Sequence, residues 1–255
     1  RNIRNSIIEC GGEVHFNTKV TDFTISGNNI THIVCNNKTI PTTHVILATG
    51  HSAREIYYSL HDAGIELEAK PFAMGVRAEH PQELINQIQY HGNMLPLLPS
   101  ATYSLVQQIQ ERGVYSFCMC PGGIIVPAAT APEEIVVNGM SLSKRNSPFA
   151  NSGFVVEVTK QEWTKFEKYQ PFAALLLQEE LEQKAFLLAN ETQSAPAQRV
   201  TDFVAEKVSS SLPKCSYIPG LTSAPLHKEL PSFIALRLRK ALFNFDRKMH
   251  GYYTE

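Results

Sequence analysis

The chain has 255 residues, of which 43% are hydrophobic and 18% are charged, and its formal net charge at pH 7 is −1. A chain of this length and apolar content can bury a sizeable core, as one large domain or two smaller ones. The balanced charge creates no field that would attract a polyanion, so nucleic acid is not an expected partner. The longest aliphatic run, residues 173–177, is far shorter than the roughly 20 apolar residues of a membrane helix.

The cysteines and the first residues bear on the compartment. The five cysteines are odd in number and include no C-x-x-C pair, which argues against a secreted disulfide framework and against a zinc site. Residues 1–4 lack the apolar segment of a signal peptide. A cytoplasmic protein in a reducing compartment, with no membrane attachment and no metal site, fits these features best. The cysteines are Cys10, Cys35, Cys118, Cys120 and Cys215.

The first part of the chain predicts a helix followed by a short antiparallel meander. Apolar residues recur at helical spacing over residues 3–10, and Gly11-Gly12 ends that helix. Clusters of Gly and Asn, which tolerate the positive φ of hairpin turns, then separate three strand-like runs. These runs are residues 13–16, 18–25 and 30–35.

The meander leads into Val45-Ile46-Leu47-Ala48, an apolar run without polar alternation that predicts a buried strand. Thr49-Gly50 ends the strand, and Ser52 with Glu55 forms a capping box for a helix that runs to about Ala63. Small residues at the carboxyl end of a strand let a ligand approach the backbone, and open α/β sheets bind ligands at that edge. The alternative is a tight strand-to-helix turn with no ligand.

The rest of the chain changes from strands to helices. Six strand candidates, and a helix that Pro81 opens, precede Thr159, where the apolar period changes from 2 to 3.6. The strand candidates are residues 72–79, 103–109, 114–120, 124–128, 135–140 and 154–158, and the later helices are 161–169, 172–188, 201–209 and 233–249.

These elements predict a fold of mixed α+β and α/β class with two domains, residues 1–70 and residues 71–255. The second domain would combine an antiparallel sheet, over about residues 72–158, with a helical part over about 159–250. Its helices carry apolar stripes that must be buried, so we expect them to pack against the strands of the same domain.

The motif at residues 118–123, CMCPGG, places two thiols on one strand. Residues two apart on a strand share a face, so Cys118 and Cys120 would line one wall. We expect both to pack as small hydrophobic side chains, because a disulfide between residues so close on a strand is strained; a redox-active pair is the alternative. Gly122 and Gly123 would clear side chains away, so that a flat ligand can lie against the main chain.

Arg77 and Glu79 would also share a strand face. They form an ion pair in one interpretation, and in the other Arg77 orients a substrate anion. His80 has an ordinary pKa close to neutrality and is an acid–base candidate, with a structural role at a helix entry as the alternative. The segment 138–145, NGMSLSKR, fits either an anion-binding loop or an exposed turn.

Several blocks of the chain resemble a family of uncharacterised bacterial FAD-dependent dehydrogenases, which use NAD and FAD. The most specific blocks are YSFCMCPGG at 115–123 and NGMSLSKR at 138–145. The other blocks cover residues 3–23, 45–57, 70–90, 150–158 and 245–252. The meander followed by Ala48-Thr49-Gly50 also resembles the middle of the FAD domain in disulfide-reductase-like flavoproteins.

The resemblance implies that residues 1–70 are part of a glutathione-reductase-like FAD-binding domain and that residues 71–255 are its substrate domain. Val20, at the edge of the meander, would meet the adenine of FAD through its backbone. Ala48, Thr49 and Gly50 would pack along the cofactor. The ligand at the two glycines of CMCPGG would be flavin or substrate.

The function that the resemblance implies is hydride transfer between a small-molecule substrate and flavin, with NAD(P)H or another electron carrier open as a further partner. Arg77, Cys118 and Cys120 are the candidates for the reacting face. A non-catalytic binding or interaction module, which keeps the fold without a cofactor, is the alternative from another functional class.

In the resembling family one Gly-rich FAD loop precedes the first block, and a second Gly-rich segment follows the last. The 14 glycines of this chain include no Gly-x-Gly, so we interpret the chain as the interior of such a protein. We therefore expect the purified chain to bind FAD weakly or not at all, as judged by its visible absorbance. A stoichiometric flavin spectrum would contradict this expectation.

Overall fold

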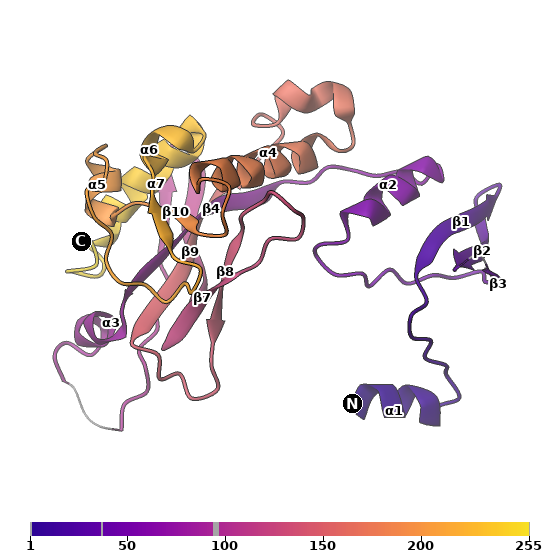
Figure 1. Cartoon of the computed structure of the whole chain (residues 1–255), viewed down its shortest axis with the longest axis horizontal. Helices are drawn as coiled ribbons and strands as arrows, with labels where there is room; N and C mark the ends of the chain where they lie inside the picture. Colours follow the sequence, from indigo (N-terminus) through magenta and orange to yellow (C-terminus); the bar gives the residue numbers. More distant parts are fainter. Residues whose placement is uncertain (1, 37, 94–96, 255) are drawn as a thin grey trace. The chain divides into compact units, whose positions relative to one another are not determined.

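The computed structural model describes residues 2–36, 38–93 and 97–254 (Figure 1). They form two compact units, residues 1–68 and residues 69–255. Among the described residues no helix is both long enough and apolar enough to cross a membrane.

The first unit contains a three-stranded antiparallel sheet in the order β1-β2-β3 and two helices. Its core is small, and Phe23, Cys35 and Leu60 are buried in it. Helix α1 buries none of its residues. The elements are α1 (Asn2–Glu9), β1 (Val20–Ser26), β2 (Asn29–Cys35), β3 (Lys38–Pro41) and α2 (Arg54–Asp62).

Two strands predicted in this unit are not formed. Residues 13–16 lie outside any strand, and the third strand of the meander is β3 instead. Residues 45–48 also lie outside any helix or strand, and Ile46 is 93% exposed. An apolar run becomes a buried strand only where other strands pair with its edges, and no strand among the described residues pairs with this one. The prediction of a buried strand at 45–48 is therefore wrong for these residues.

The predicted capping box is not formed either. Helix α2 begins at Arg54, its N-cap residue is Ala53, and no side chain caps it. The predicted end of the helix is confirmed, since Gly64 follows it with a φ of +77°.

The second unit is built on a four-stranded antiparallel sheet in the order β4-β9-β6-β5, accompanied by two smaller sheets. The strands of the large sheet are β4 (Phe72–Pro81), β5 (Val106–Ile109), β6 (Arg112–Cys120) and β9 (Phe149–Val158). The antiparallel pair consists of β7 (Gly123–Pro127) and β8 (Val137–Ser141), and the parallel pair of β10 (Ala195–Ala197) and β11 (Leu221–Ser223).

Helices follow the sheet in the chain, and the predicted change from strands to helices at Thr159 is confirmed. The mixed class with antiparallel strands is confirmed as well. The short elements β10, β11 and α6 were not predicted, because they are too brief to show a period. The helices are α3 (Gln82–Gln89), the 3-10 helix η1 (Thr164–Tyr169), α4 (Ala173–Leu188), α5 (Val200–Val204), α6 (Leu226–Glu229) and α7 (Ser232–Phe245).

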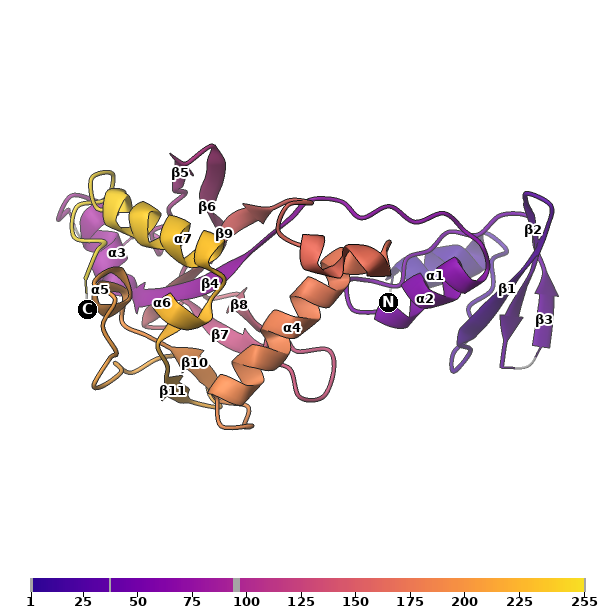
Figure 2. The ribbon, with the colours of Figure 1, turned by 90° about the horizontal axis from the view of Figure 1, so that it is seen from above.

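Helix α7 covers one face of the large sheet (Figure 2). Phe154 and Val156 of β9 and Val114 of β6 are completely buried there, together with Leu238 and Phe245 of α7. Phe154 also lies 5.5 Å from Phe245, measured between ring centroids. The helix therefore packs on the strands of its own unit, with an apolar core between them.

The β7–β8 pair approaches the opposite face of the sheet, which carries polar residues. Side chains alternate along a strand, so Arg77 lies on the face opposite to Val76, which packs against the α7 core. On β8, a Cβ added to Gly139 would lie 2.2 Å from Arg77 Nη1. A polar layer thus separates the sheet from the β7–β8 pair.

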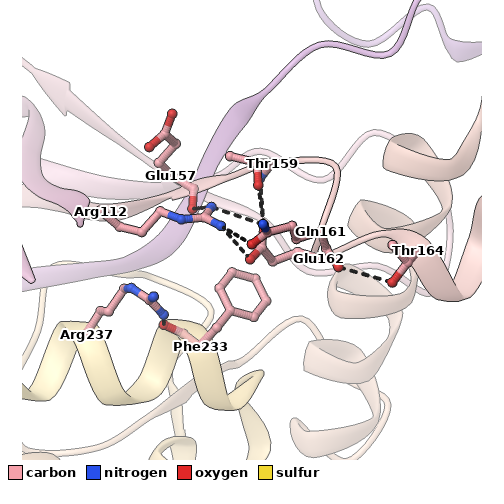
Figure 3. A network of polar contacts seen from close by, with 8 residues as sticks. All are labelled: Arg112, Glu157, Thr159, Gln161, Glu162, Thr164, Phe233 and Arg237. Carbon is pink, nitrogen blue, oxygen red and sulfur yellow. Dashed lines mark hydrogen bonds and ion pairs between the residues drawn. The ribbon is translucent and has the colours of Figure 1, made fainter. Parts of the chain in front are cut away.

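An ion pair between Arg112 and Glu162 joins the start of β6 to the segment before η1 (Figure 3). Arg112 donates from Nη1 to Glu162 Oε2 (3.1 Å) and from Nη2 to Oε1 (3.0 Å). Thr159 donates to Oε2 from its backbone N–H (2.8 Å) and its hydroxyl (2.9 Å). Burial raises the pKa of Glu162, but the bonds from Thr159 and Arg112 outweigh it and leave this pKa lowered.

Glu162→Ala should destabilise the protein by about 3 kcal/mol, because the Arg112 and Glu162 side chains are only 13% and 10% exposed and Arg112 would be left without its carboxylate. Glu167→Ala is the matched control: its pair with Lys160 spans 3.8 Å and is largely exposed, so its loss should cost roughly 0.5 kcal/mol or less. Urea unfolding of the two variants measures the difference. Equal midpoints would show that the buried pair contributes nothing.

Candidate functional site

Arg77 is at the centre of the polar layer between the large sheet and the β7–β8 pair. Its Nη1 donates to Asn151 Oδ1 on β9 (2.5 Å) and to the carbonyl of Cys118 on β6 (3.3 Å), and its Nη2 donates to Asn138 Oδ1 on β8 (3.4 Å). Three strands besides its own therefore hold the guanidinium. We call Arg77, Cys118, Cys120, Asn138 and Asn151 the Arg77 cluster.

Two glycines make room for this arrangement. Arg77 stands opposite Gly153 in the β4–β9 register, so no side chain lies directly across from it on β9. On β8, a Cβ at Gly139 would lie 2.2 Å from Arg77 Nη1 and 2.4 Å from Asn151 Oδ1. A larger residue at position 139 would displace the cluster or the strand.

A β-bulge shapes the side of the cluster that β6 supplies. Phe117 pairs with Gly153 and Cys120 pairs with Asn151, so two residues of β6 oppose the single residue between them on β9. Cys118, the first residue of the bulge, has a φ of +47°. The bulge turns the Cys118 carbonyl toward Arg77 Nη1.

The two thiols of the cluster are free and differ in exposure: Cys118 is exposed and Cys120 is buried. Cys120 Sγ donates to the Cys118 carbonyl at 3.3 Å, and Met119 packs against the α7 core on the other side of the sheet. Cys120 thus has a packing and hydrogen-bonding role in the fold. The structure gives Cys118 no comparable burial.

The ion pair expected between Arg77 and Glu79 is not formed. Glu79 accepts two hydrogen bonds from Ser216 instead. The backbone N–H of Ser216 donates to Oε2 (2.8 Å), and the Ser216 hydroxyl donates to Oε1. Burial raises the pKa of Glu79, while the Ser216 bonds and the charge of Arg77 oppose that rise. Within the described residues, the hydrogen-bond acceptors of Arg77 are therefore neutral oxygens.

One buried donor group of the cluster has no acceptor among the residues that the structure describes. Asn151 is completely buried, and its Nδ2 makes no hydrogen bond there. Burial lowers the pKa of Arg77, partly opposed by Cys120 and Cys118, but a guanidinium stays charged near neutral pH. The cluster therefore presents a fixed cation next to an unsatisfied amide N–H group of Asn151.

Gly122 and Gly123 do not bare the main chain for a ligand in the way that the sequence suggested. A Cβ at Gly122 would lie 1.8 Å from the carbonyl oxygen of Arg145, and one at Gly123 would lie 2.6 Å from that of Met140. The chain's own backbone fills the space. The structure thus explains both glycines by close packing, and their contact with flavin or substrate stays a prediction.

The residues predicted to contact the cofactor in the first unit are more exposed than Gly122 and Gly123. Ala48, Thr49 and Gly50 are exposed, and none of them takes part in a hydrogen bond within the described residues. Val20 begins β1, which is an edge strand, and is half-buried. An uncovered main chain fits contact with a cofactor such as FAD, and these four residues stay predicted contacts.

His80 has a structural position and is no acid–base candidate. It is 3% exposed, its Nε2 lies 3.0 Å from the carbonyl oxygen of Tyr252, and its ring centroid is 4.4 Å from that of Tyr252. Burial lowers its pKa from 6.5 to about 4, and the bond to Tyr252 opposes this only in part. The imidazole is therefore neutral near pH 7.

The low pKa of His80 predicts how the free energy of unfolding changes at acid pH. The unfolded chain binds a proton at His80 more readily than the folded chain does. The contribution of neutral His80 to the free energy of unfolding is therefore fully present above pH 6.5 and is lost as the pH falls toward 4, by about 3 kcal/mol in total. In urea unfolding between pH 7 and pH 4, His80→Gln should flatten the pH dependence. His250→Gln is the control, because the His250 side chain is 99% exposed. A His80→Gln profile as steep as that of the parent would refute this account.

The residues that hold Arg77 in place were not predicted from the sequence. Asn138 was noted only as part of a polar loop, and Asn151 was not noted as a functional candidate. A signal was present, since Asn151-Ser152-Gly153 interrupts a strand whose other residues, apart from Glu157, are apolar. No group of three or more His, Cys, Asp or Glu within the described residues is placed to hold a metal ion.

Comparison with known proteins shows the family to which the chain belongs. Residues 71–255 match the model of the family described as FAD-dependent protein, C-terminal domain-like. The chain is also 41% identical, over 260 residues, to an uncharacterised protein of Clostridium beijerinckii. That alignment covers 100% of this chain and 48% of the relative, so the chain spans about half the length of the protein that it matches.

Proposed function

Since the chain belongs to the FAD-dependent protein family whose C-terminal domain matches residues 71–255, we propose that it is part of an FAD-dependent oxidoreductase, a dehydrogenase of the cytoplasm. The family match across the second unit is the observation that carries this proposal. The chemistry would be hydride transfer between a small-molecule substrate and flavin, with NAD(P)H or another electron carrier as a further partner. Bound flavin supplies the redox chemistry, and this chain supplies binding, orientation and exclusion of water.

The first unit would contribute to a glutathione-reductase-like FAD-binding domain, through Val20 and the residues 48–50. The exposed apolar run at 45–48 supports this role, because it has the composition of a buried strand and lacks strand neighbours among the described residues. The relative is about twice as long as this chain, which is consistent with further segments that supply those neighbours.

The second unit would bind the substrate, with Arg77 as the orienting group. Four strands, β4, β6, β8 and β9, fix its guanidinium, and its partners are neutral oxygens. A cation held in this way orients a reactant without changing its own position, which is what hydride transfer requires of a binding site. Cys118 and Cys120 would support the geometry of the bulge and take no part in electron transfer.

The proposal is tested on the intact protein. Purified from its full gene, it should carry flavin or bind added FAD, and one member of a metabolite panel should bleach the flavin absorbance under anaerobic conditions. An intact protein that binds no FAD would overturn the proposal and favour a non-catalytic binding module.

Once a reducing substrate is found, Arg77→Ala should slow flavin reduction about 100-fold, which is roughly 2.7 kcal/mol of barrier. Arg247→Ala is the matched control, because Arg247 is exposed on the same unit, and it should leave the rate unchanged. Cys118→Ser and Cys120→Ser should also leave the rate largely unchanged. A loss of 100-fold or more in either serine variant, with the fold intact, would make a thiol catalytic instead.

A further inference from the structure

We propose that the Arg77 cluster is a binding site for a carboxylate, so that the substrate of the proposed oxidoreductase is an organic acid. The identification of the ligand as a substrate rests on the proposed function. The binding of a carboxylate by the cluster is argued from the structure and does not depend on that function.

The first observation is a held cation without an ion-pair partner. Among the described residues, Arg77 donates to two amide oxygens and one carbonyl, and the nearest carboxylate on its strand face, Glu79, is bonded to Ser216. Burial lowers the pKa of Arg77, partly opposed by Cys120 and Cys118, and this direction agrees with a cation that no carboxylate contacts. A carboxylate ligand is the anion whose two oxygens match the fork of guanidinium N–H groups.

The second observation is the buried amide of Asn151. Its orientation is determined, because Arg77 can only donate and so faces Oδ1. The Nδ2 group of the same amide is then a buried donor with no acceptor in the described part of the chain, although burying an unsatisfied donor costs about 1–3 kcal/mol. A ligand oxygen beside the guanidinium would satisfy it.

The third observation is the surroundings of the cation. Phe117 stands across Gly153 from Arg77 in the register of β6, β9 and β4, and Phe117 is 56% exposed. Cys118, whose carbonyl Arg77 binds, is exposed as well. The cluster therefore borders solvent on the β6 side, with an apolar ring next to a cation, and this combination suits the carbon skeleton and the carboxylate of an organic acid.

The exposed thiol of Cys118 provides a reporter that needs neither flavin nor a known substrate. The purified chain is treated with iodoacetate, an anion, and in parallel with iodoacetamide, its neutral analogue, and peptide mass spectrometry measures the rate at each cysteine. The ratio of the two rates at Cys118 reports attraction of a carboxylate, because the neutral reagent corrects for changes in thiol exposure. Cys10, also exposed but in the first unit, is the internal reference.

Arg77→Gln should lower the iodoacetate-to-iodoacetamide ratio at Cys118 about fivefold and leave the ratio at Cys10 unchanged. Asn151→Asp should do the same, because it keeps an oxygen for Arg77 while it adds a competing carboxylate and removes the Nδ2 donor. Arg77→Lys should retain part of the preference. Added succinate should slow the reaction of iodoacetate at Cys118 only.

An unchanged ratio at Cys118 in Arg77→Gln and Asn151→Asp, with circular dichroism showing both variants folded, would overturn the proposal, as would a lack of protection by succinate. Either result leaves the FAD-dependent function intact. Conversely, an intact protein without flavin would remove the proposed function but not the carboxylate site.

Discussion

The second unit depends on β9, which is paired on both edges and covered on both faces. Strands β4 and β6 flank it, α7 covers one face, and the β7–β8 pair approaches the other. Seven of its ten residues are buried as a result. On the α7 side this burial is apolar apart from Ser152, which alternates with Asn151 and lies opposite Ala78 of the α7 core. On the other side it encloses Asn151, whose polar atoms must find partners or carry a desolvation cost.

That requirement explains why the polar layer is organised as it is. Asn151 accepts a hydrogen bond from Arg77 through Oδ1 (2.5 Å). Gly139 and Gly153 leave space for a guanidinium between the sheet and the β7–β8 pair. The bulge of β6 turns a carbonyl to the same cation. A site of this kind keeps its shape before any ligand arrives, since its members are fixed by strands.

Two arginines of the same sheet show how a structural charge differs from one available for binding. Arg112 meets a carboxylate with both of its terminal nitrogens, and Thr159 completes the acceptor side of that pair. Arg77 is held as firmly, but by neutral oxygens. The charge of Arg112 is thus balanced within the fold, while that of Arg77 is balanced by no direct partner among the described residues. This contrast is the reason to connect Arg77, rather than Arg112, with function.

The amino-acid sequence by itself determined the mixed class, the strands and helices with a clear period, and the change from sheet to helices at Thr159, because these depend on local alternation. It also singled out Arg77, through its position on a strand. The tertiary structure decided what local pattern cannot encode: the strand pairing that leaves residues 45–48 uncovered, the bulge at Cys118, and the burial that makes His80 structural. It also decided the partners of Arg77, since Asn138 and Asn151 lie 61 and 74 positions along the chain from it and meet it only when three strands assemble.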